Sequence, residues 1–205
     1  MSSTFTSKIP NILTIGRMVG TVFMVYYYYF ATFYKFEILW FVFFLASISD
    51  YLDGYISRKF NAVSNFGKCL DPISDKLLLI TALIILIDAK LINLLIAFIL
   101  IGREIIISGL REFLSLQNVE LPVSRLSKWK TSFQLFGVGM CFFSNAYYIT
   151  SGYLKHFGDF TILTPLTYIV ENTEISTNII LVIAVYTTLH TAFSYIRSSA
   201  KYLQK

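Results

Sequence analysis

Long apolar runs, each close to the length that crosses a lipid bilayer, are the feature that most restricts how this chain can fold. Residues 12–33, for example, contain one charged side chain, Arg17. A transmembrane helix needs roughly 20 consecutive, predominantly apolar residues. Only 14% of the residues are charged and 56% are hydrophobic, whereas about a quarter of a soluble domain is usually charged. The sequence therefore predicts an all-α, polytopic membrane protein.

The apolar runs predict six transmembrane helices in a single domain that covers residues 1–205. Their expected bounds are about 12–33, 38–57, 66–87, 91–116, 127–149 and 175–196. Pro10 fits the first turn of the first helix. We expect a tight turn at 88–90 and a longer connection over 150–174, whose middle, 160–170, is expected to lie at the membrane interface.

Lysine and arginine are distributed unequally between the two sides that these helices define. With the N-terminus inside, 14 of the 17 basic residues fall on the inner side, and the outer side holds Lys35, Lys90 and Lys155. The positive-inside rule then places both termini in the cytoplasm. The net charge of +5 fits contact with anionic lipid and requires no nucleic-acid partner. A short chain without a targeting extension favours a bacterial inner (plasma) membrane.

One short stretch holds a third of the 12 acidic residues of the chain, namely Asp50, Asp53, Asp71 and Asp75. The first two are three residues apart and the last two are four apart, so each pair shares one face of a predicted helix. Because a short cytoplasmic loop joins the two helices, the carboxylates are expected to converge at the inner membrane surface. Carboxylates without histidine or thiolate partners are typical of Mg²⁺ or Mn²⁺ sites, and two such ions suit phosphoryl transfer.

Two glycines and an arginine accompany the aspartates at regular spacings. Gly54 and Gly67 allow a ligand to approach the backbone closely, and Arg58 suits a bidentate contact with phosphate. They disfavour the simpler alternative, in which the aspartates are helix-end carboxylates neutralised by lysines. The stretch follows the pattern D-x2-D-G-x2-A-R-x8-G-x3-D-x3-D, with Ser57 in place of alanine. In this it resembles the CDP-alcohol phosphotransferases.

Three further segments, residues 9–17, 102–113 and 123–131, resemble the phosphatidylglycerophosphate synthases within that family. The resemblance implies a metal-dependent transferase of phospholipid biosynthesis. The enzyme would move the phosphatidyl group from CDP-diacylglycerol to sn-glycerol 3-phosphate and release phosphatidylglycerol phosphate and CMP. The resemblance also implies a homodimer, with the active site on the cytoplasmic side.

The resemblance assigns roles to residues by their position in its motifs. The metal ligands would be Asp50, Asp53, Asp71 and Asp75. Asp75 would also be the general base that takes the proton from the glycerol hydroxyl. The residues expected to contact the CDP-lipid are Asn11, Thr14, Arg17, Gly54, Arg58, Ser64 and Gly67. An alternative for the first three is capping of the first helix.

The acceptor phosphate is a dianion and needs cations, which the fourth and fifth predicted helices carry. Glu104, Ser108 and Arg111 share one helix face, and charges inside a membrane usually face the interior of the bundle. The residues predicted to bind the acceptor phosphate are Arg103, Arg111, Lys128 and Lys130. The alternative is a Glu104–Arg111 ion pair, with the remaining arginines reaching the membrane surface.

Three other functions remain open from the sequence. An intramembrane prenyltransferase also combines aspartates with Mg²⁺, but it lacks this spacing of glycine and arginine. A divalent-cation transporter would use the aspartates as an ion path, but it would hold them near the middle of the bilayer. The third alternative keeps the same family but has serine, inositol phosphate or phosphatidylglycerol as the acceptor.

Overall fold

The structure, a computed structural model, describes residues 9–60, 65–117, 119, 125–157 and 173–203. Its side chains are described within 11–50, 70–117, 119, 129–146 and 177–200. All regular secondary structure in these ranges is helical, which confirms the all-α prediction. The helices are α2 (Ile9–Phe30), α3 (Lys35–Phe60), α4 (Asn65–Asp88), α5 (Leu94–Leu116), α6 (Arg125–Phe157) and α8 (Thr173–Leu203).

The short turns between helices follow from local chemistry. Pro10 lies in the first turn of α2, where its missing N–H group is tolerated. The predicted turn after Asp88 is confirmed, and Lys90 adopts a left-handed conformation with φ of 61°. The next helix begins at Leu94, later than expected, because the Asn93 side chain caps it by accepting from the Leu95 N–H at 2.8 Å.

The fifth predicted helix is longer than expected. It continues to Phe157, whereas the sequence predicted a connection from residue 150 onward. Gly152 suggested that connection, but one glycine costs a helix only about 1 kcal/mol relative to alanine, and no proline interrupts α6. The expected interfacial segment at 160–170 lies outside the described residues.

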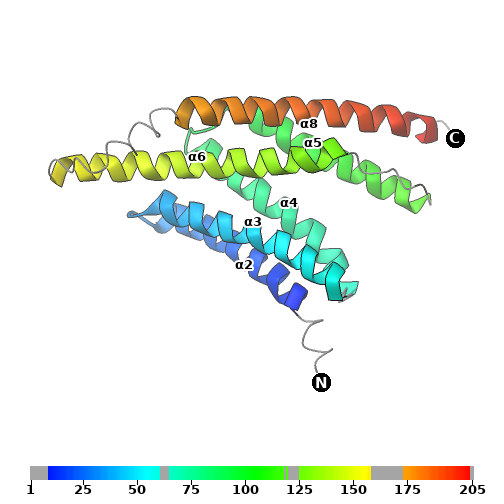
Figure 1. The fold of residues 1–205 in the computed structure, drawn as a ribbon, viewed down its shortest axis with the longest axis horizontal. Helices are drawn as coiled ribbons and strands as arrows, with labels where there is room; N and C mark the ends of the chain where they lie inside the picture. Colours follow the sequence, from blue (N-terminus) through cyan, green and yellow to red (C-terminus); the bar gives the residue numbers. More distant parts are fainter. Residues whose placement is uncertain (1–8, 61–64, 118, 120–124, 158–172, 204–205) are drawn as a thin grey trace, which may run out of the picture.

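The helices form one bundle in which neighbours in sequence are mostly neighbours in space. α2 packs against α3 and α4, α3 packs against α6, and α8 packs against both α5 and α6. Figure 1 shows the two longest helices, α6 and α8, running side by side in opposite directions. The starts of α2, α4 and α6 and the ends of α3 and α8 lie toward the same end of the bundle, on the right of Figure 1.

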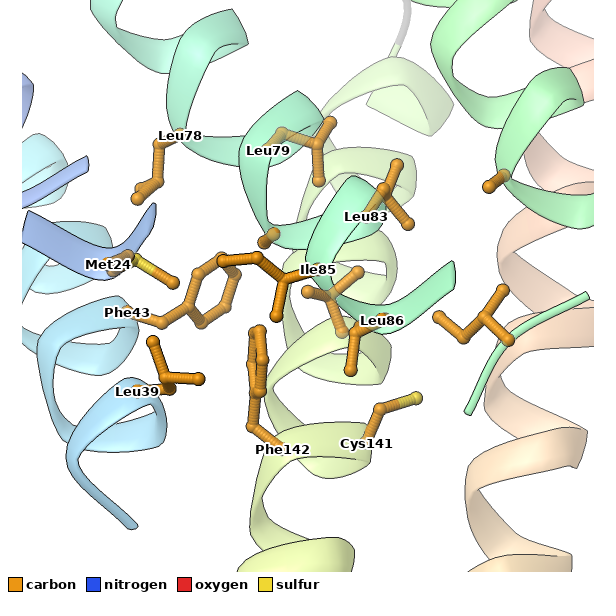
Figure 2. Packing of buried hydrophobic residues seen from close by; sticks show 14 of the residues in the cluster. Met24, Leu39, Phe43, Leu78, Leu79, Leu83, Ile85, Leu86, Cys141 and Phe142 are labelled. Carbon is orange, nitrogen blue, oxygen red and sulfur yellow. The ribbon is translucent and has the colours of Figure 1, made fainter. Parts of the chain in front are cut away.

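An apolar core fills the middle of the bundle where α2, α3, α4 and α6 meet. Met24, Leu39, Leu86 and Phe142 are fully buried in it. The rings of Phe43 and Phe142 lie with their centroids 5.8 Å apart, and Figure 2 shows both rings close to Ile85 of α4. This core separates the polar ends of the helices from each other.

Many large apolar side chains face outward. On α2 the exposed residues Val19, Val22 and Tyr26 form a stripe, while on the opposite face Thr14 and Arg17 are buried. A soluble helix has the reverse arrangement. Among the described residues, one segment, Thr177–Ala200, meets the length and hydropathy expected of a membrane-crossing helix.

Candidate active site

The candidate site lies where the first half of α2 passes α3 and α4. Thr14, Arg17 and Thr21 are spaced so that they share one face of α2, and each is no more than 2% exposed. This buried polar face contacts the two helices that carry the aspartates. The first predicted helix is therefore part of the site.

Arg17 joins carboxylates of two different helices. Its Nη1 group lies 2.7 Å from Oδ1 of Asp50 on α3 and also forms an ion pair with Oδ1 of Asp75 on α4. The guanidinium side chain is fully buried, whereas the two carboxylates are 41% and 46% exposed. Arg17 therefore pairs with the two carboxylates from the buried side, and both carboxylates remain accessible to solvent.

Thr14 adds a third aspartate to this arrangement. Its hydroxyl donates to Oδ1 of Asp71 at 2.5 Å. Asp50, Asp71 and Asp75 therefore lie around one face of α2, and they come from two helices, as their spacing suggested. Asp53 follows one turn after Asp50 on α3, but its side chain is outside the described set.

Thr14 and Arg17 do not act as helix caps. α2 begins at Ile9, so Thr14 and Arg17 lie inside it, and their side chains contact other helices. Asn11 lies in the first turn and is partly buried. Of the other residues predicted to contact the CDP-lipid, Gly54 and Arg58 lie on α3 and Gly67 on α4, with their surroundings outside the described side chains, and Ser64 lies outside the described residues.

A small polar cavity of about 100 Å³ opens beside these carboxylates. Five helices contribute to it, so only the tertiary fold brings its walls together. Its polar lining consists of Arg17, Ser47, Asp50, Asp75, Lys76, Glu104, Thr131 and Gln134. The cavity therefore offers polar and charged partners to a small molecule, beside apolar wall supplied by Leu78, Leu79 and Leu135.

A cluster of charges on α5 and α6 borders the cavity. Lys130, only 1% exposed, forms an ion pair with Glu104. Arg103 lies 3.4 Å from the same carboxylate and donates to the Thr191 hydroxyl on α8 at 3.1 Å. Two of the four predicted phosphate-binding cations are thus held together by one glutamate.

The other two predicted cations are placed differently. Arg111 is exposed and lies over the ring of Tyr195 on α8, with 5.6 Å to the centroid. Glu104 pairs with Lys130 and Arg103, so the alternative Glu104–Arg111 ion pair is not the arrangement that the structure contains. Lys128 lies on α6, and its side chain is outside the described set.

An apolar groove runs from the same region along the outside of α3 and α6. It has a volume of about 460 Å³ and is lined by aromatic residues that include Trp40, Phe44 and Phe136. Ser47 and Leu135 line both this groove and the polar cavity. A polar site and an apolar groove therefore share a wall.

The donor atoms around the cavity suit a divalent metal. Carboxylate oxygens are the ligands preferred by hard cations, and a buried cationic group, that of Arg17, already pairs with two of them. Within the described side chains, no three aspartate, glutamate, histidine or cysteine residues converge as a ready metal centre. The predicted fourth ligand, Asp53, is not among those side chains.

Several residues of the cavity were not predicted from the sequence. They are Ser47, Lys76, Thr131 and Gln134. One signal was available, because a polar residue within an apolar helix is often functional, and Gln134 follows Lys130 by one turn. Which of the polar residues face the cavity depends on how the helices pack.

Comparison with known proteins agrees with the motif and with the geometry. Residues 7–190 match the family described as CDP-alcohol phosphatidyltransferase. A relative from Rickettsia felis is 36% identical over 197 residues, which cover 95% of this chain and 97% of the relative. A relative from Rickettsia bellii is 34% identical over 95% of this chain and 97% of its own length.

A third relative, from Rickettsia typhi, is 42% identical over 65% of this chain and 75% of its own length. All three relatives are named CDP-diacylglycerol–glycerol-3-phosphate 3-phosphatidyltransferase. The match covers the aspartate stretch and all the helices that line the cavity. It sets aside the transporter and prenyltransferase alternatives, and this chain belongs to the CDP-alcohol phosphatidyltransferase family.

Proposed function

We propose that this protein transfers the phosphatidyl group of CDP-diacylglycerol to sn-glycerol 3-phosphate, giving phosphatidylglycerol phosphate and CMP. Relatives that match nearly the whole chain carry the name of this activity. The observation that carries the proposal is that one face of α2 contacts aspartates of two helices, with Arg17 on Asp50 and Asp75 and Thr14 on Asp71, beside a cavity that Arg17, Asp50 and Asp75 line. Phosphoryl transfer depends mainly on positioning and charge neutralisation, which this arrangement supplies.

Asp75 is the proposed general base. Its carboxylate is 46% exposed and lines the cavity, so an acceptor in the cavity can reach it. Asp75 accepts the hydroxyl proton of the glycerol, and the glycerol oxygen attacks the phosphorus that carries the diacylglycerol. The bond from that phosphorus to the bridging oxygen breaks, and CMP leaves with the electron pair.

Members of this family generally use a divalent metal. Here Asp50, Asp53, Asp71 and Asp75 would hold Mg²⁺ or Mn²⁺, two ions in each site. The bound cations would neutralise the diphosphate of the donor. Thr14 contacts Asp71, and Arg17 contacts Asp50 and Asp75. These two residues would therefore orient three of the four proposed metal ligands.

The acceptor phosphate is proposed to lie near the α5–α6 cations. Lys130 and Arg103 share Glu104, and a phosphate dianion would compete with that carboxylate for them. Lys76, next in sequence to Asp75, lines the cavity and is a further candidate. Arg111 and Lys128 complete the predicted set. Arg111→Ala should raise the acceptor KM, and an unchanged value in an active enzyme would remove Arg111 from the set.

The donor is proposed to enter from the lipid. The groove between α3 and α6 shares Ser47 and Leu135 with the cavity, so an acyl chain in the groove would leave the diphosphate at the aspartates. Its nucleotide would contact residues from the starts of α2 and α4 and the end of α3. The predicted contacts are Asn11, Thr14, Arg17, Gly54, Arg58, Ser64 and Gly67.

All six helices are proposed to cross the membrane as one domain over residues 1–205. The exposed apolar stripes on α2, α5 and α8 support this, since large exposed apolar surfaces mark contacts with lipid or protein. The excess of basic residues supports an orientation with the aspartate end in the cytoplasm, and the proposed location is a bacterial inner (plasma) membrane. A homodimer remains the expected assembly.

One assay tests the reaction. Purified protein is incubated with CDP-diacylglycerol, Mg²⁺ or Mn²⁺, and one acceptor at a time, and CMP release is followed. The acceptors are glycerol 3-phosphate, serine, inositol phosphate and phosphatidylglycerol. We expect CMP with glycerol 3-phosphate. Release with serine alone would overturn the proposed acceptor, and no release with any acceptor would overturn the proposed reaction.

A further inference from the structure

Gln134 is a buried amide in the wall of the cavity that the proposed mechanism leaves without a role. It lies on α6 and is only 1% exposed. Neither its Oε1 nor its Nε2 atom has a hydrogen-bond partner among the described residues. Because buried polar groups in folded proteins almost always have partners, a partner that enters the cavity is the simplest account of this amide.

Gln134 shares the cavity with groups of both charges. On α6, Lys130 lies one turn before it, paired with Glu104. Asp50 and Asp75 line the same cavity. Cations suit the acceptor phosphate and a carboxylate suits the hydroxyl that loses its proton. A neutral amide, with donors and an acceptor, matches a hydroxyl that stays neutral throughout the reaction.

We infer that Gln134 binds the C2 hydroxyl of glycerol 3-phosphate, the hydroxyl that does not react. The inference rests on the proposed function and deepens it, because it names the residue that selects a polyol phosphate over a simple alkyl phosphate. The Oε1 atom accepts from this hydroxyl and the Nε2 group donates to it. An acceptor without the C2 hydroxyl would leave the buried amide unpaired, which is how a site built for a hydroxyl rejects its absence.

The test compares two acceptors that differ only at that position. 3-Hydroxypropyl phosphate keeps the phosphate and the reacting primary hydroxyl but has no C2 hydroxyl. The complete enzyme, purified with lipid and metal, is assayed for CMP release with each acceptor. We expect kcat/KM to favour glycerol 3-phosphate by about 10- to 100-fold.

Gln134→Met then removes the amide while keeping the side chain's length. It should reduce the preference to within about threefold, chiefly by lowering kcat/KM for glycerol 3-phosphate. The KM for CDP-diacylglycerol and the activity with 3-hydroxypropyl phosphate should stay near the unchanged enzyme's values. Thr188→Val is the matched control, because Thr188 is also fully buried with an unpartnered hydroxyl among the described residues but does not line this cavity. It should keep the full preference.

The outcomes separate this inference from the proposed function. An unchanged enzyme that releases no CMP with glycerol 3-phosphate contradicts the proposed function. An active enzyme with equal kcat/KM for both acceptors contradicts only the role of Gln134, and this comparison does not depend on whether a variant folds. Gln134→Met with the preference of the unchanged enzyme also contradicts that role.

Discussion

Arg17 is the residue that connects the carboxylates of α3 and α4 at this site. Its buried guanidinium pairs with Asp50 and Asp75, which belong to different helices. Removing one partner from a buried charge network is usually destabilising because the remaining charges repel or lose their compensation. The exposure of both carboxylates reduces that penalty, since water solvates them. Arg17 is therefore expected to matter more for the geometry of the site than for folding.

Arg17→Leu tests this expectation. We expect the free energy of unfolding to fall by about 1–2 kcal/mol and kcat for CMP release to fall by at least about 100-fold, because Asp50 and Asp75 lose the group that positions them. Arg17→Lys should recover part of the activity, since a lysine supplies charge but cannot bridge both carboxylates in the same way. Arg17→Leu with unchanged kcat would contradict the positioning role.

Asp75 carries the proposed proton transfer. Asp75→Asn keeps the shape of the side chain but removes its ability to accept a proton. We expect kcat to fall by about 10²- to 10⁴-fold, the usual contribution of a general base, while binding of labelled CDP-diacylglycerol is retained. Asp88→Asn is the control, because Asp88 lies at the other end of α4 and accepts a hydrogen bond from Tyr28 at 2.7 Å. Full activity of Asp75→Asn would mean that the base lies elsewhere.

At the scale of elements, successive parts of α6 contribute to the site, to the contact with α8 and to the apolar core. Its early turns pair Lys130 with Glu104 and place Gln134 in the cavity wall, and its middle places Phe142 in the core. Between them Gly137 allows α8 to come close. A Cβ atom at Gly137 would lie 3.2 Å from Ile180 and 3.3 Å from Leu181. This contact sets the distance between the two longest helices.

Gly137→Leu tests that contact. A leucine there has to displace side chains of α8, so we expect the free energy of unfolding to fall by about 1–3 kcal/mol, the typical penalty of overpacking. Gly109→Leu is the matched control on α5, because a Cβ at Gly109 has nothing within 4 Å. Thermal unfolding in detergent compares the two variants. Equal melting temperatures would show that α6 and α8 are not held at this distance by Gly137.

At the scale of the whole molecule, polar side chains lie inside one end of the bundle and apolar side chains cover much of its outside. α6 has 33 residues and is therefore about 50 Å long at 1.5 Å per residue. A bilayer's hydrocarbon core is about 30 Å thick, so part of α6 would extend beyond it. With the aspartate end inside, the site would face the cytoplasm, where a soluble acceptor can reach it.

Single cysteines test this orientation. In a variant with Cys69 and Cys141 replaced by serine, Ser198→Cys on α8 and Lys90→Cys at the opposite end are labelled in intact cells by an impermeant maleimide. Both positions are exposed. We expect labelling of Lys90→Cys before lysis and of Ser198→Cys only after lysis. The reverse pattern would place the site on the outer side.

Local patterns in the sequence were sufficient for the all-helical fold and for the family. Helix formation follows from apolar runs, and the spacing of Asp71 and Asp75 places both on one face of a helix without any knowledge of packing. The predicted end of the fifth helix, at about residue 149, was wrong because α6 continues to Phe157. Gly152 is a weak helix-breaking signal that the neighbouring helical residues override. The predicted roles of the CDP-lipid residues stay predictions.

The family and the order of the helices were therefore determined by the sequence itself, because both depend on residues close to each other in the chain. The tertiary structure decided which distant side chains meet. It placed Arg17 between Asp50 and Asp75, joined Lys130 to Glu104, and buried Gln134 in the wall of the cavity. These contacts join different helices, so they depend on the rotation and spacing of whole helices, which no local pattern specifies.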